Sequence, residues 1–269
     1  MSISQFKESD FPKTLRGYQY ECILGNGTYG VVCKYNKDGA SFAVKFESQY
    51  SNTQMIQEKQ RLKMIDAENQ KIQDENLKIK APKIILDGSI RAQNNSSITF
   101  NYIILDFLSQ SIFDGQQYLS KSNLAVQMIQ QLENLHAIGI VHRDVKLENF
   151  MINNNQVYLI DLGASKEYLV KNEFGETSHL PLKTQCSIMG TPYTASLNSH
   201  RCIEVVRADD LISVIYSLIW LWDDSFPMKV QVLQSIERNA SVQEQFAICY
   251  QLKQSLRASH LSNFPYLQK

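Results

Sequence analysis

The chain has 269 residues and equal numbers of basic and acidic side chains, 27 of each, so its formal net charge is zero. Hydrophobic residues make up 43% and charged residues 20%, which excludes a disordered, collagen-like or disulfide-scaffold chain. A neutral chain gives no electrostatic reason to expect nucleic acid or an anionic membrane as a partner.

Three further features narrow the class of protein. The five cysteines are scattered and form no Cys-x-x-Cys pair, so we expect neither a disulfide framework nor a zinc site. Residues 1–13 contain no apolar stretch, which argues against a signal peptide. The apolar run at residues 211–222 is too short for a bilayer crossing, and we expect a helix buried in a core there.

The first third of the chain alternates strand-like runs with turn signals. Three runs rich in Val, Phe, Tyr and Cys come first, at residues 18–27, 29–36 and 40–47. An amphipathic helix is expected within residues 52–73. Residues 84–90 and 98–107 predict a hairpin with a long polar tip. We therefore expect an antiparallel sheet that carries one helix.

The remainder of the chain is predicted to be mostly helical. The expected helices are residues 123–139, which end at Gly139 as a C-cap, 211–222 and 242–258. Short strands are expected at 150–153 and 157–161, and a long irregular segment at 164–200. The sheet lobe is predicted to span about residues 1–106, a hinge about 106–111, and a helical lobe about 112–269.

Residues 25–32 read Gly-x-Gly-x-x-Gly-x-Val. Glycines allow backbone N–H groups to approach phosphate oxygens because no Cβ stands in the way. A glycine-rich hairpin without a ligand is the alternative. A strand-like run follows the loop, whereas a dinucleotide-binding loop opens a helix. The pattern therefore favours a phosphate-binding loop between two antiparallel strands.

Lys45 lies in an apolar strand-like run 15 residues after Gly30. A solvated surface lysine is the default for any single lysine, but a lysine beside a phosphate loop is suited to bind the α and β phosphates. Such a lysine needs a carboxylate partner, and Glu58 in the expected helix is the main candidate, although it could also be an exposed helix residue. Glu47 is too close in sequence and Glu68 lies toward the helix end, so both are weaker candidates.

Residues 140–150 contain His-Arg-Asp-x-Lys-x-x-Asn, a pattern that is very improbable by chance in a chain of this length. Asp144 can accept a hydrogen bond from a substrate hydroxyl and take its proton. Lys146 can neutralise charge on a moving phosphoryl group, and Asn149 offers an oxygen to Mg²⁺. Asp161 ends an apolar run 17 residues after Asp144 and is expected to be the main Mg²⁺ carboxylate, with an ordinary turn as the alternative.

Together these motifs resemble the protein kinase superfamily over nearly the whole chain. Residues 190–200, Gly-Thr-Pro-Tyr-Thr-Ala-Ser-Leu-Asn-Ser-His, replace the usual Ala-Pro-Glu and are similar to the casein kinase 1 family, as are residues 203–204 and 207–213. The resemblance implies an α+β, bilobal protein kinase fold, with an antiparallel β-sheet N-lobe carrying one helix and a mainly helical C-lobe. All of residues 1–269 would then form one kinase domain.

The resemblance also implies an ATP site. Besides Lys45, the residues implied for it are Leu24, Gly25, Asn26, Gly27, Gly30, Val32, Ala43, Leu105, Asp106, Leu108 and Met151. Val32, Ala43 and Met151 would enclose the adenine ring, which the backbone of Asp106 and Leu108 would hydrogen-bond. Leu105 would lie at the back of the adenine pocket.

The resemblance assigns two further roles and shows one departure. Asp210 would anchor the catalytic loop, and Asn198 takes the place of the missing glutamate of Ala-Pro-Glu. Tyr193 stands where the family has an arginine that binds an acidic or phosphorylated substrate group, so this chain lacks that charge.

The expected function is a serine/threonine protein kinase that uses ATP and Mg²⁺. A pseudokinase that acts as a binding scaffold is the main alternative, and a small-molecule kinase is a third. Lys45, Asp144, Asn149 and Asp161 are all present, whereas pseudokinases commonly lose at least one. The resemblance implies a monomer with protein substrates and with no nucleic acid or membrane partner. It also implies an intracellular location, in the cytoplasm and in the nucleus as well.

Overall fold

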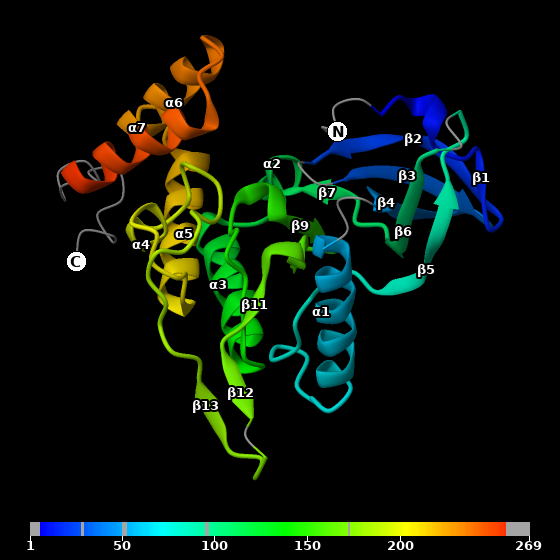
Figure 1. The fold of residues 1–269 in the computed structure, drawn as a ribbon, viewed down its shortest axis with the longest axis horizontal. Coiled ribbons are helices and arrows are strands. Elements are labelled where there is room, and N and C mark those ends of the chain that lie inside the picture. The colour runs from blue at the N-terminus through cyan, green and yellow to red at the C-terminus, as the bar shows by residue number, and fades with distance from the viewer. Residues whose placement is uncertain (1–5, 28–29, 50–52, 95–96, 172, 257–269) are drawn as a thin grey trace. The chain divides into compact units, whose positions relative to one another are not determined.

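The computed structural model describes residues 6–27, 30–49, 53–94, 97–171 and 173–256 (Figure 1). The chain divides into two compact units. Unit 1 comprises Met1–Gln110 and Met151–Ala164, and unit 2 comprises Ser111–Phe150 and Ser165–Lys269. The first division falls within the predicted hinge range. Residues 151–164, expected in the helical lobe, are grouped with unit 1.

Unit 1 contains a six-stranded antiparallel sheet in the order β1-β2-β3-β4-β6-β5 and the helix α1 (Figure 1). The elements are β1 Thr14–Leu15, β2 Tyr18–Asn26, β3 Val31–Lys37, β4 Ala40–Ser48, α1 Thr53–Asn69, β5 Ile84–Arg91 and β6 Thr99–Asp106, after a short 3₁₀ turn at Glu8–Asp10. The predicted sheet with one helix and the predicted hairpin of β5 and β6 are both confirmed.

The register of this sheet separates its two faces. Lys45 pairs with Val32 on one side and with Ile103 on the other, and Ala43 pairs with Leu105. Because directly paired residues share a face and neighbours along a strand alternate, these five side chains lie on one face. The opposite face carries the aromatic and aliphatic core of unit 1, which includes Val31, Cys33, Tyr35, Val44, Phe46, Tyr102 and Ile104.

Residues 151–164 add two strands and a turn to unit 1. The elements are β9 Phe150–Asn153, whose first residue belongs to unit 2, β10 Gln156–Leu159 and a 3₁₀ turn at Leu162–Ala164. The Leu159 N–H donates to the Lys80 carbonyl at 2.8 Å. Gly163 lies against α1, since a Cβ added there would come within 3.1 Å of the Gln54 Cβ. These contacts place Asp161 beside α1.

Unit 2 is mainly helical, as expected. Its helices are α2 Ile112–Gly115, α3 Lys121–Ala137, α4 Leu197–His200, α5 Arg207–Trp222, α6 Pro227–Glu237 and α7 Val242–Ser255, with 3₁₀ turns at Gln116–Tyr118 and Leu147–Asn149. Gly139 follows α3 with φ +84°, a conformation that glycine adopts without strain. Helices α5, α6 and α7 share an apolar cluster formed by Ile219, Phe226, Met228, Val232 and Cys249. Within the described ranges, no helix is long and apolar enough to cross a membrane.

The irregular segment predicted at 164–200 was wrong in part. β11 Lys166–Glu167 pairs with β8 Ile140–Val141, and β12 Leu169–Lys171 pairs with β13 Thr177–His179. Gly175, at φ +81°, lies in the turn between β12 and β13. The side chains of β13 are exposed, so this hairpin lacks the apolar alternation that reveals a strand in sequence. Helix α6 also had no prediction.

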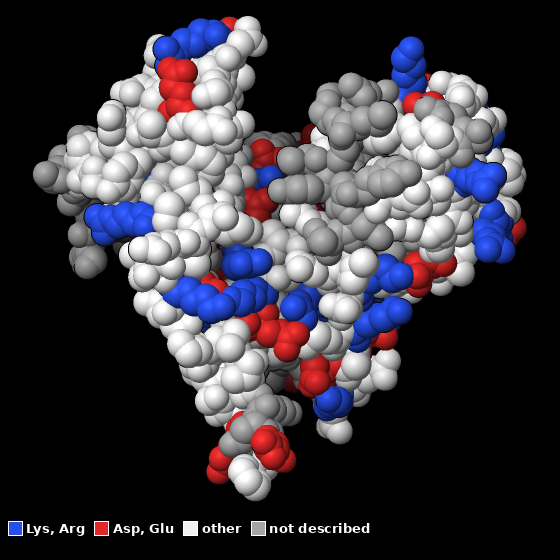
Figure 2. Space-filling view, in the orientation of Figure 1, with Lys and Arg blue, Asp and Glu red and all other residues white. Residues whose placement is uncertain are grey.

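Figure 2 shows basic and acidic side chains interspersed on the face that it draws. Exposed ion pairs of the described residues include Lys71 with Glu68 and Arg238 with Glu244. Exposed pairs of this kind contribute about 0–1 kcal/mol each, so they add little to the stability of the fold.

Candidate active site

The glycine-rich loop connects β2 and β3 of unit 1. Gly25 pairs with Val32 and Asn26 with Val31, and the Gly27 N–H donates to the Gly30 carbonyl at 2.8 Å. Two residues of the motif, at positions 28 and 29, lie outside the described residues. The prediction that the loop lies between two antiparallel strands, and does not open a helix, is confirmed.

The three loop positions Gly25, Gly27 and Gly30 require glycine for different structural reasons. A Cβ at Gly30 would come within 2.5 Å of the Phe46 carbonyl oxygen, so the packing of the chain itself requires glycine there. A Cβ at Gly25 would meet no atom of the described chain within 4 Å, and one at Gly27 would make only an ordinary contact. The absence of side chains at Gly25 and Gly27 keeps the loop backbone open to a ligand.

Lys45 is 9% exposed and contacts two carboxylates of unit 1. Its Nζ donates to Glu58 Oε2 at 2.6 Å and to Asp161 Oδ1 at 3.0 Å. Burial alone lowers the pKa of Lys45, but the charges of Glu58 and Asp161 outweigh it and raise that pKa. Lys45 is therefore a fixed positive charge. Of the three glutamates weighed as its partner, the structure places Glu58 against it.

Glu47 has a different position. It is 1% exposed, and its Oε2 accepts a hydrogen bond from the Met55 N–H in the first turn of α1 at 3.1 Å. Its Oε1 is buried and has no hydrogen-bond partner among the described residues. Glu47 thus ties β4 to the start of the helix that carries Glu58. Burial raises the pKa of Glu47 to about 7, against the opposing charge of Lys45.

We predict that Glu47 makes stability depend on pH. Because its folded pKa is raised above the ordinary value of 4.5, its contribution to stability is complete below pH 4.5 and is lost as pH rises through about 7. Glu47→Gln should remove this loss, which amounts to up to about 3 kcal/mol. Urea unfolding at pH 5 and pH 8 measures it, with Glu68→Gln, at a partly exposed side chain paired with Lys71, as control. An equal pH dependence in Glu47→Gln and wild type would contradict the assignment.

Among the residues expected to line the adenine site, Val32, Ala43 and Leu105 share the sheet face of Lys45, whereas Met151 lies on β9 in a separate sheet. Val32, Ala43 and Met151 are half-buried and Leu105 is buried, whereas Leu24 is 46% exposed. This face is thus only partly covered by the chain.

Two backbone positions were expected to hydrogen-bond adenine. The Asp106 N–H already donates to the Lys83 carbonyl at 3.2 Å. Only the carbonyl of Asp106 is therefore left for the predicted hydrogen bond to adenine. The Asp106 carboxylate accepts from the Lys83 N–H at 3.1 Å, which closes this pairing. Leu108 is buried, and its backbone hydrogen bond to adenine stays a prediction.

In unit 2, the Asp144 carboxylate is surrounded by donors. Asn149 Nδ2 donates to the Asp144 carbonyl at 2.8 Å and to Oδ2 at 3.3 Å. Lys146 Nζ lies 3.2 Å from Oδ2, and the Thr191 hydroxyl donates to Oδ1 at 2.9 Å. The side chain keeps 20% of its area exposed. Asp144 is thus held in one orientation while remaining accessible.

Asp210, at the start of α5, holds the backbone before Asp144. Its carboxylate accepts from the N–H of His142 at 2.8 Å and of Arg143 at 2.9 Å, and contacts the His136 ring at 2.8 Å. Arg143 has φ +70°, a strained conformation for a residue with a Cβ. The expectation that Asp210 anchors this loop agrees with these contacts.

Residues 190–195 lie against the same loop. Gly190 has φ +90°, and a Cβ there would come within 3.2 Å of the Arg143 carbonyl oxygen. The Tyr193 hydroxyl donates to the two carboxylate oxygens of Glu148 at 2.9 and 3.1 Å. The Tyr193 ring stacks on Trp220, with centroids 4.0 Å apart and planes at 24°. Tyr193 is therefore fixed on two sides.

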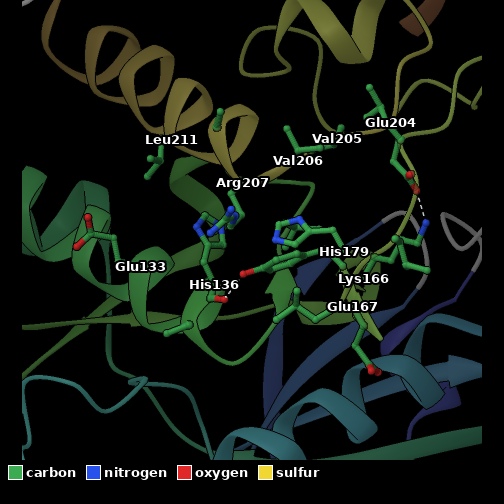
Figure 3. A pocket seen from close by; sticks show the side chains of 17 residues that line it. Glu133, His136, Lys166, Glu167, His179, Glu204, Val205, Val206, Arg207 and Leu211 are labelled. Carbon is green, nitrogen blue, oxygen red and sulfur yellow. Dashed lines mark hydrogen bonds and ion pairs between the residues drawn. The ribbon is translucent and has the colours of Figure 1, made fainter. Parts of the chain in front are cut away.

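A hollow of unit 2, with a volume of about 1050 Å³, contains none of these catalytic candidates. It lies between α3, β11 to β13 and the start of α5 (Figure 3). Three of its polar side chains are paired within the chain: Lys166 contacts Glu204, and the Tyr168 hydroxyl donates to the His136 carbonyl at 2.6 Å. Arg207 stacks over Tyr168. The catalytic candidates are therefore assigned from their contacts with one another and not from this hollow.

Comparison with known proteins decides the family. Residues 18–195 match the family model of the protein kinase domain. The chain belongs to the protein kinase family. It is 30% identical over 214 residues to a protein of Encephalitozoon cuniculi (strain GB-M1) named "Probable casein kinase I homolog", with 76% of this chain covered. The kinase chain spans 62% of that relative's length.

The family uses ATP and a divalent cation, and each unit of the kinase has an oxygen donor of the kind that binds such cations. The amide nitrogen of Asn149 is bound to Asp144, so Oδ1 is the side-chain atom left for a cation. One oxygen of Asp161 accepts from Lys45, in a carboxylate that is 42% exposed. Carboxylate and amide oxygens are ligands for hard divalent cations. Within the described ranges, no group of three or more His, Cys, Asp and Glu residues could hold a metal by itself.

Two contacts of the kinase had no sequence prediction. Glu148 is an ordinary helix-turn glutamate by sequence, and its partner Tyr193 is 45 residues away. Glu47 was considered only as a partner of Lys45, and its role at the start of α1 was missed. The sequence did contain one signal for a structural role of Glu47. It lies two positions after Lys45, and a buried strand rarely contains two charged residues so close together.

Proposed function

We propose that this kinase is a serine/threonine protein kinase of the casein kinase 1 type. It would transfer the γ-phosphoryl group of ATP to serine or threonine hydroxyls of proteins. The observation that carries the proposal is the environment of Asp144. Its carboxylate is accessible, and Asn149, Thr191 and Lys146 hold it in place.

The role proposed for Asp144 follows from this environment. An oriented carboxylate can accept the hydrogen bond of an acceptor hydroxyl and take its proton as the phosphoryl group moves. Lys146, beside the same carboxylate, supplies positive charge where negative charge develops on the transferred group. The hydroxyl of Thr191 occupies Oδ1, which limits the directions from which an acceptor can approach Asp144.

The residues of unit 1 are proposed to bind the nucleotide. Lys45 is held as a permanent cation by Glu58 and Asp161 and would bind the α and β phosphates. Mg²⁺, when bound, would neutralise phosphate charge. Asp161 and Asn149 are the side chains that we propose to coordinate it.

The substrate class and setting are also part of the proposal. The similarity to a casein kinase I homologue and the segment 190–200 support protein acceptors and a casein kinase 1 type. All five cysteines are free, which fits the intracellular location that the family resemblance implies. A monomer is the assembly that we propose.

Radiolabelled ATP with casein and a panel of serine, threonine and tyrosine peptides tests the function. Wild type should label serine or threonine residues, and Asp144→Ala should not do so measurably under the same conditions. Identification of the labelled amino acid separates serine or threonine from tyrosine. Nucleotide binding without transfer to any protein or peptide would contradict the proposal.

Tyr193 leads to a prediction about substrate choice. The side chain is neutral, it is fixed by Glu148 and Trp220, and the adjacent Glu148 carboxylate repels a phosphate. We expect similar kcat/KM values for matched peptides with and without a priming phosphate. Tyr193→Arg should raise the ratio for the primed peptide several-fold. A strong preference of wild type for the primed peptide would contradict this prediction.

A further inference from the structure

Lys253 on α7 is a buried lysine bound to three acceptors. It is 4% exposed. Its Nζ donates to the Pro192 carbonyl at 2.8 Å and to the Ala195 carbonyl at 2.5 Å, and lies 3.2 Å from His200 Nε2. These three acceptors match the three N–H groups of an ammonium. The Tyr216 ring of α5 lies 4.6 Å from Nζ and provides a cation–π contact.

Burying a lysine without a carboxylate costs free energy. Among the described residues, no carboxylate lies within ion-pair distance of Lys253, and its partners are backbone carbonyls, an imidazole and an aromatic ring. An apolar residue at this site between α4, α5 and α7 would avoid the free energy cost of burying the charge. The lysine is therefore better explained by what it binds than by the stability of the unit.

Lys253 binds the backbone of a segment that also contacts the catalytic loop. Thr191 precedes the first carbonyl and donates to Asp144. Tyr193 lies between the two carbonyls and donates to Glu148. Side chains of residues 191–195 therefore donate hydrogen bonds to the catalytic loop. Backbone carbonyls of the same segment accept hydrogen bonds from Lys253 on α7. Their position sets the space beside Asp144, where the proposed function requires a peptide to lie.

We propose that Lys253 is a positioning residue that holds residues 191–195 in the conformation that accepts the peptide substrate. This inference rests on the proposed protein kinase function and deepens it. Lys253 acts through the carbonyls of Pro192 and Ala195 and does not touch the reacting atoms. It should therefore affect peptide binding and leave ATP binding unchanged.

The electrostatics of the site support this role. Burial lowers the pKa of Lys253 to about 7, slightly opposed by Cys249 on the same helix. Burial raises the pKa of Cys249 to about 11 and of Tyr216 to about 12, and it lowers that of His200 on α4 to about 4. In this cluster, only Lys253 changes its charge between pH 6 and pH 8. Deprotonation removes one of its three N–H donors, so the segment should be held less firmly above pH 7.

Lys253→Met tests the inference because it keeps an unbranched side chain of nearly the same length and removes its donors. We expect the KM for an unprimed peptide to rise about tenfold, the factor that corresponds to ~1.4 kcal/mol. The KM for ATP should change by less than about twofold, as expected for a site that does not contact the nucleotide. The urea unfolding midpoint should change little, because the loss of three hydrogen bonds is offset by the removal of a buried charge that has no carboxylate partner.

Lys121→Met is the matched control. Lys121 also lies over an aromatic ring of unit 2, that of Trp222 at 5.3 Å, and it is exposed. It should leave both KM values at the wild-type level. A pH series from 6 to 8.5 with a peptide that does not titrate in this range adds a test that needs no variant. The peptide KM of wild type should rise with pH, and that of Lys253→Met should stay constant.

The outcomes separate the two proposals. A wild-type chain that phosphorylates peptides, with a peptide KM unchanged in Lys253→Met or constant across the pH series, would overturn the role of Lys253 and leave the kinase function standing. Equal increases in the KM for ATP and for peptide would also overturn it, because they would indicate general damage. A wild-type chain that phosphorylates no peptide or protein would overturn the function itself.

Discussion

Asp144→Ala should lower the turnover of peptide phosphorylation on the order of 10²–10⁴-fold, the range of a general-base contribution. The KM for ATP should change little, because the contacts of Lys45 with Glu58 and Asp161 do not involve Asp144. Steady-state kinetics with saturating ATP and varied peptide measures both values. This is one of the two largest effects that we expect from a single substitution.

The structure indicates why the loss should be in kcat. Asn149 keeps its 2.8 Å hydrogen bond to the backbone carbonyl of residue 144 when the carboxylate is removed, so its own orientation should persist. Thr191 loses its acceptor, which could also displace the segment 191–195. Thr191→Val separates the two effects, since it removes the same hydrogen bond and leaves the carboxylate. It should raise the peptide KM and lower kcat far less than Asp144→Ala does.

Asp224→Ala is a suitable control for Asp144→Ala. The side chain of Asp224 is 96% exposed and pairs only with Lys229 among the described residues. Its removal should leave kinetics and stability close to wild type, as for most exposed ion pairs. A phosphorylation rate of Asp144→Ala equal to that of wild type would remove Asp144 from the proposed chemistry.

Much of the candidate site could be predicted because its residues lie in short motifs whose spacing fixes the local geometry. Lys45 and Glu58 are 13 residues apart in sequence, and the strand and helix that carry them were both recognisable from hydrophobic pattern. Asp161 followed from its place after an apolar strand. The catalytic loop was recognisable because Asp144, Lys146 and Asn149 lie within six residues.

What could not be predicted depends on contacts between distant segments. The partners of Lys253 are 58 and 61 residues away, and a lysine in an amphipathic helix is normally read as solvated. The side chains of β13 are exposed, so no apolar pattern marked the hairpin that it forms with β12. Glu47 was considered only as an alternative to Glu58. Its distance in sequence does not reveal that its side chain binds the first turn of α1.

Asp161→Asn should lower Mg²⁺-dependent phosphoryl transfer by roughly 10²–10³-fold, the size expected when one preorganised electrostatic partner is lost. The amide keeps an oxygen that can accept from Lys45, so the contact at 3.0 Å need not be lost. What the substitution removes is the negative charge. A neutral oxygen binds a hard dication more weakly than a carboxylate does, and the remaining proposed ligand, Asn149, is also neutral.

The measurement is a titration of nucleotide binding and of activity with Mg²⁺ for wild type and Asp161→Asn. We expect the variant to need more Mg²⁺ for half-maximal activity and to bind ATP nearly as well as wild type when Mg²⁺ is absent. Asp87→Asn, on β5 and paired with Lys59, is the control for loss of a carboxylate from an ion pair in unit 1. Identical Mg²⁺ titrations of Asp161→Asn and wild type would contradict the metal assignment. The Lys45 pair with Glu58 remains in the variant, so a normal unfolding midpoint would place the defect in cation binding and not in the folding of unit 1.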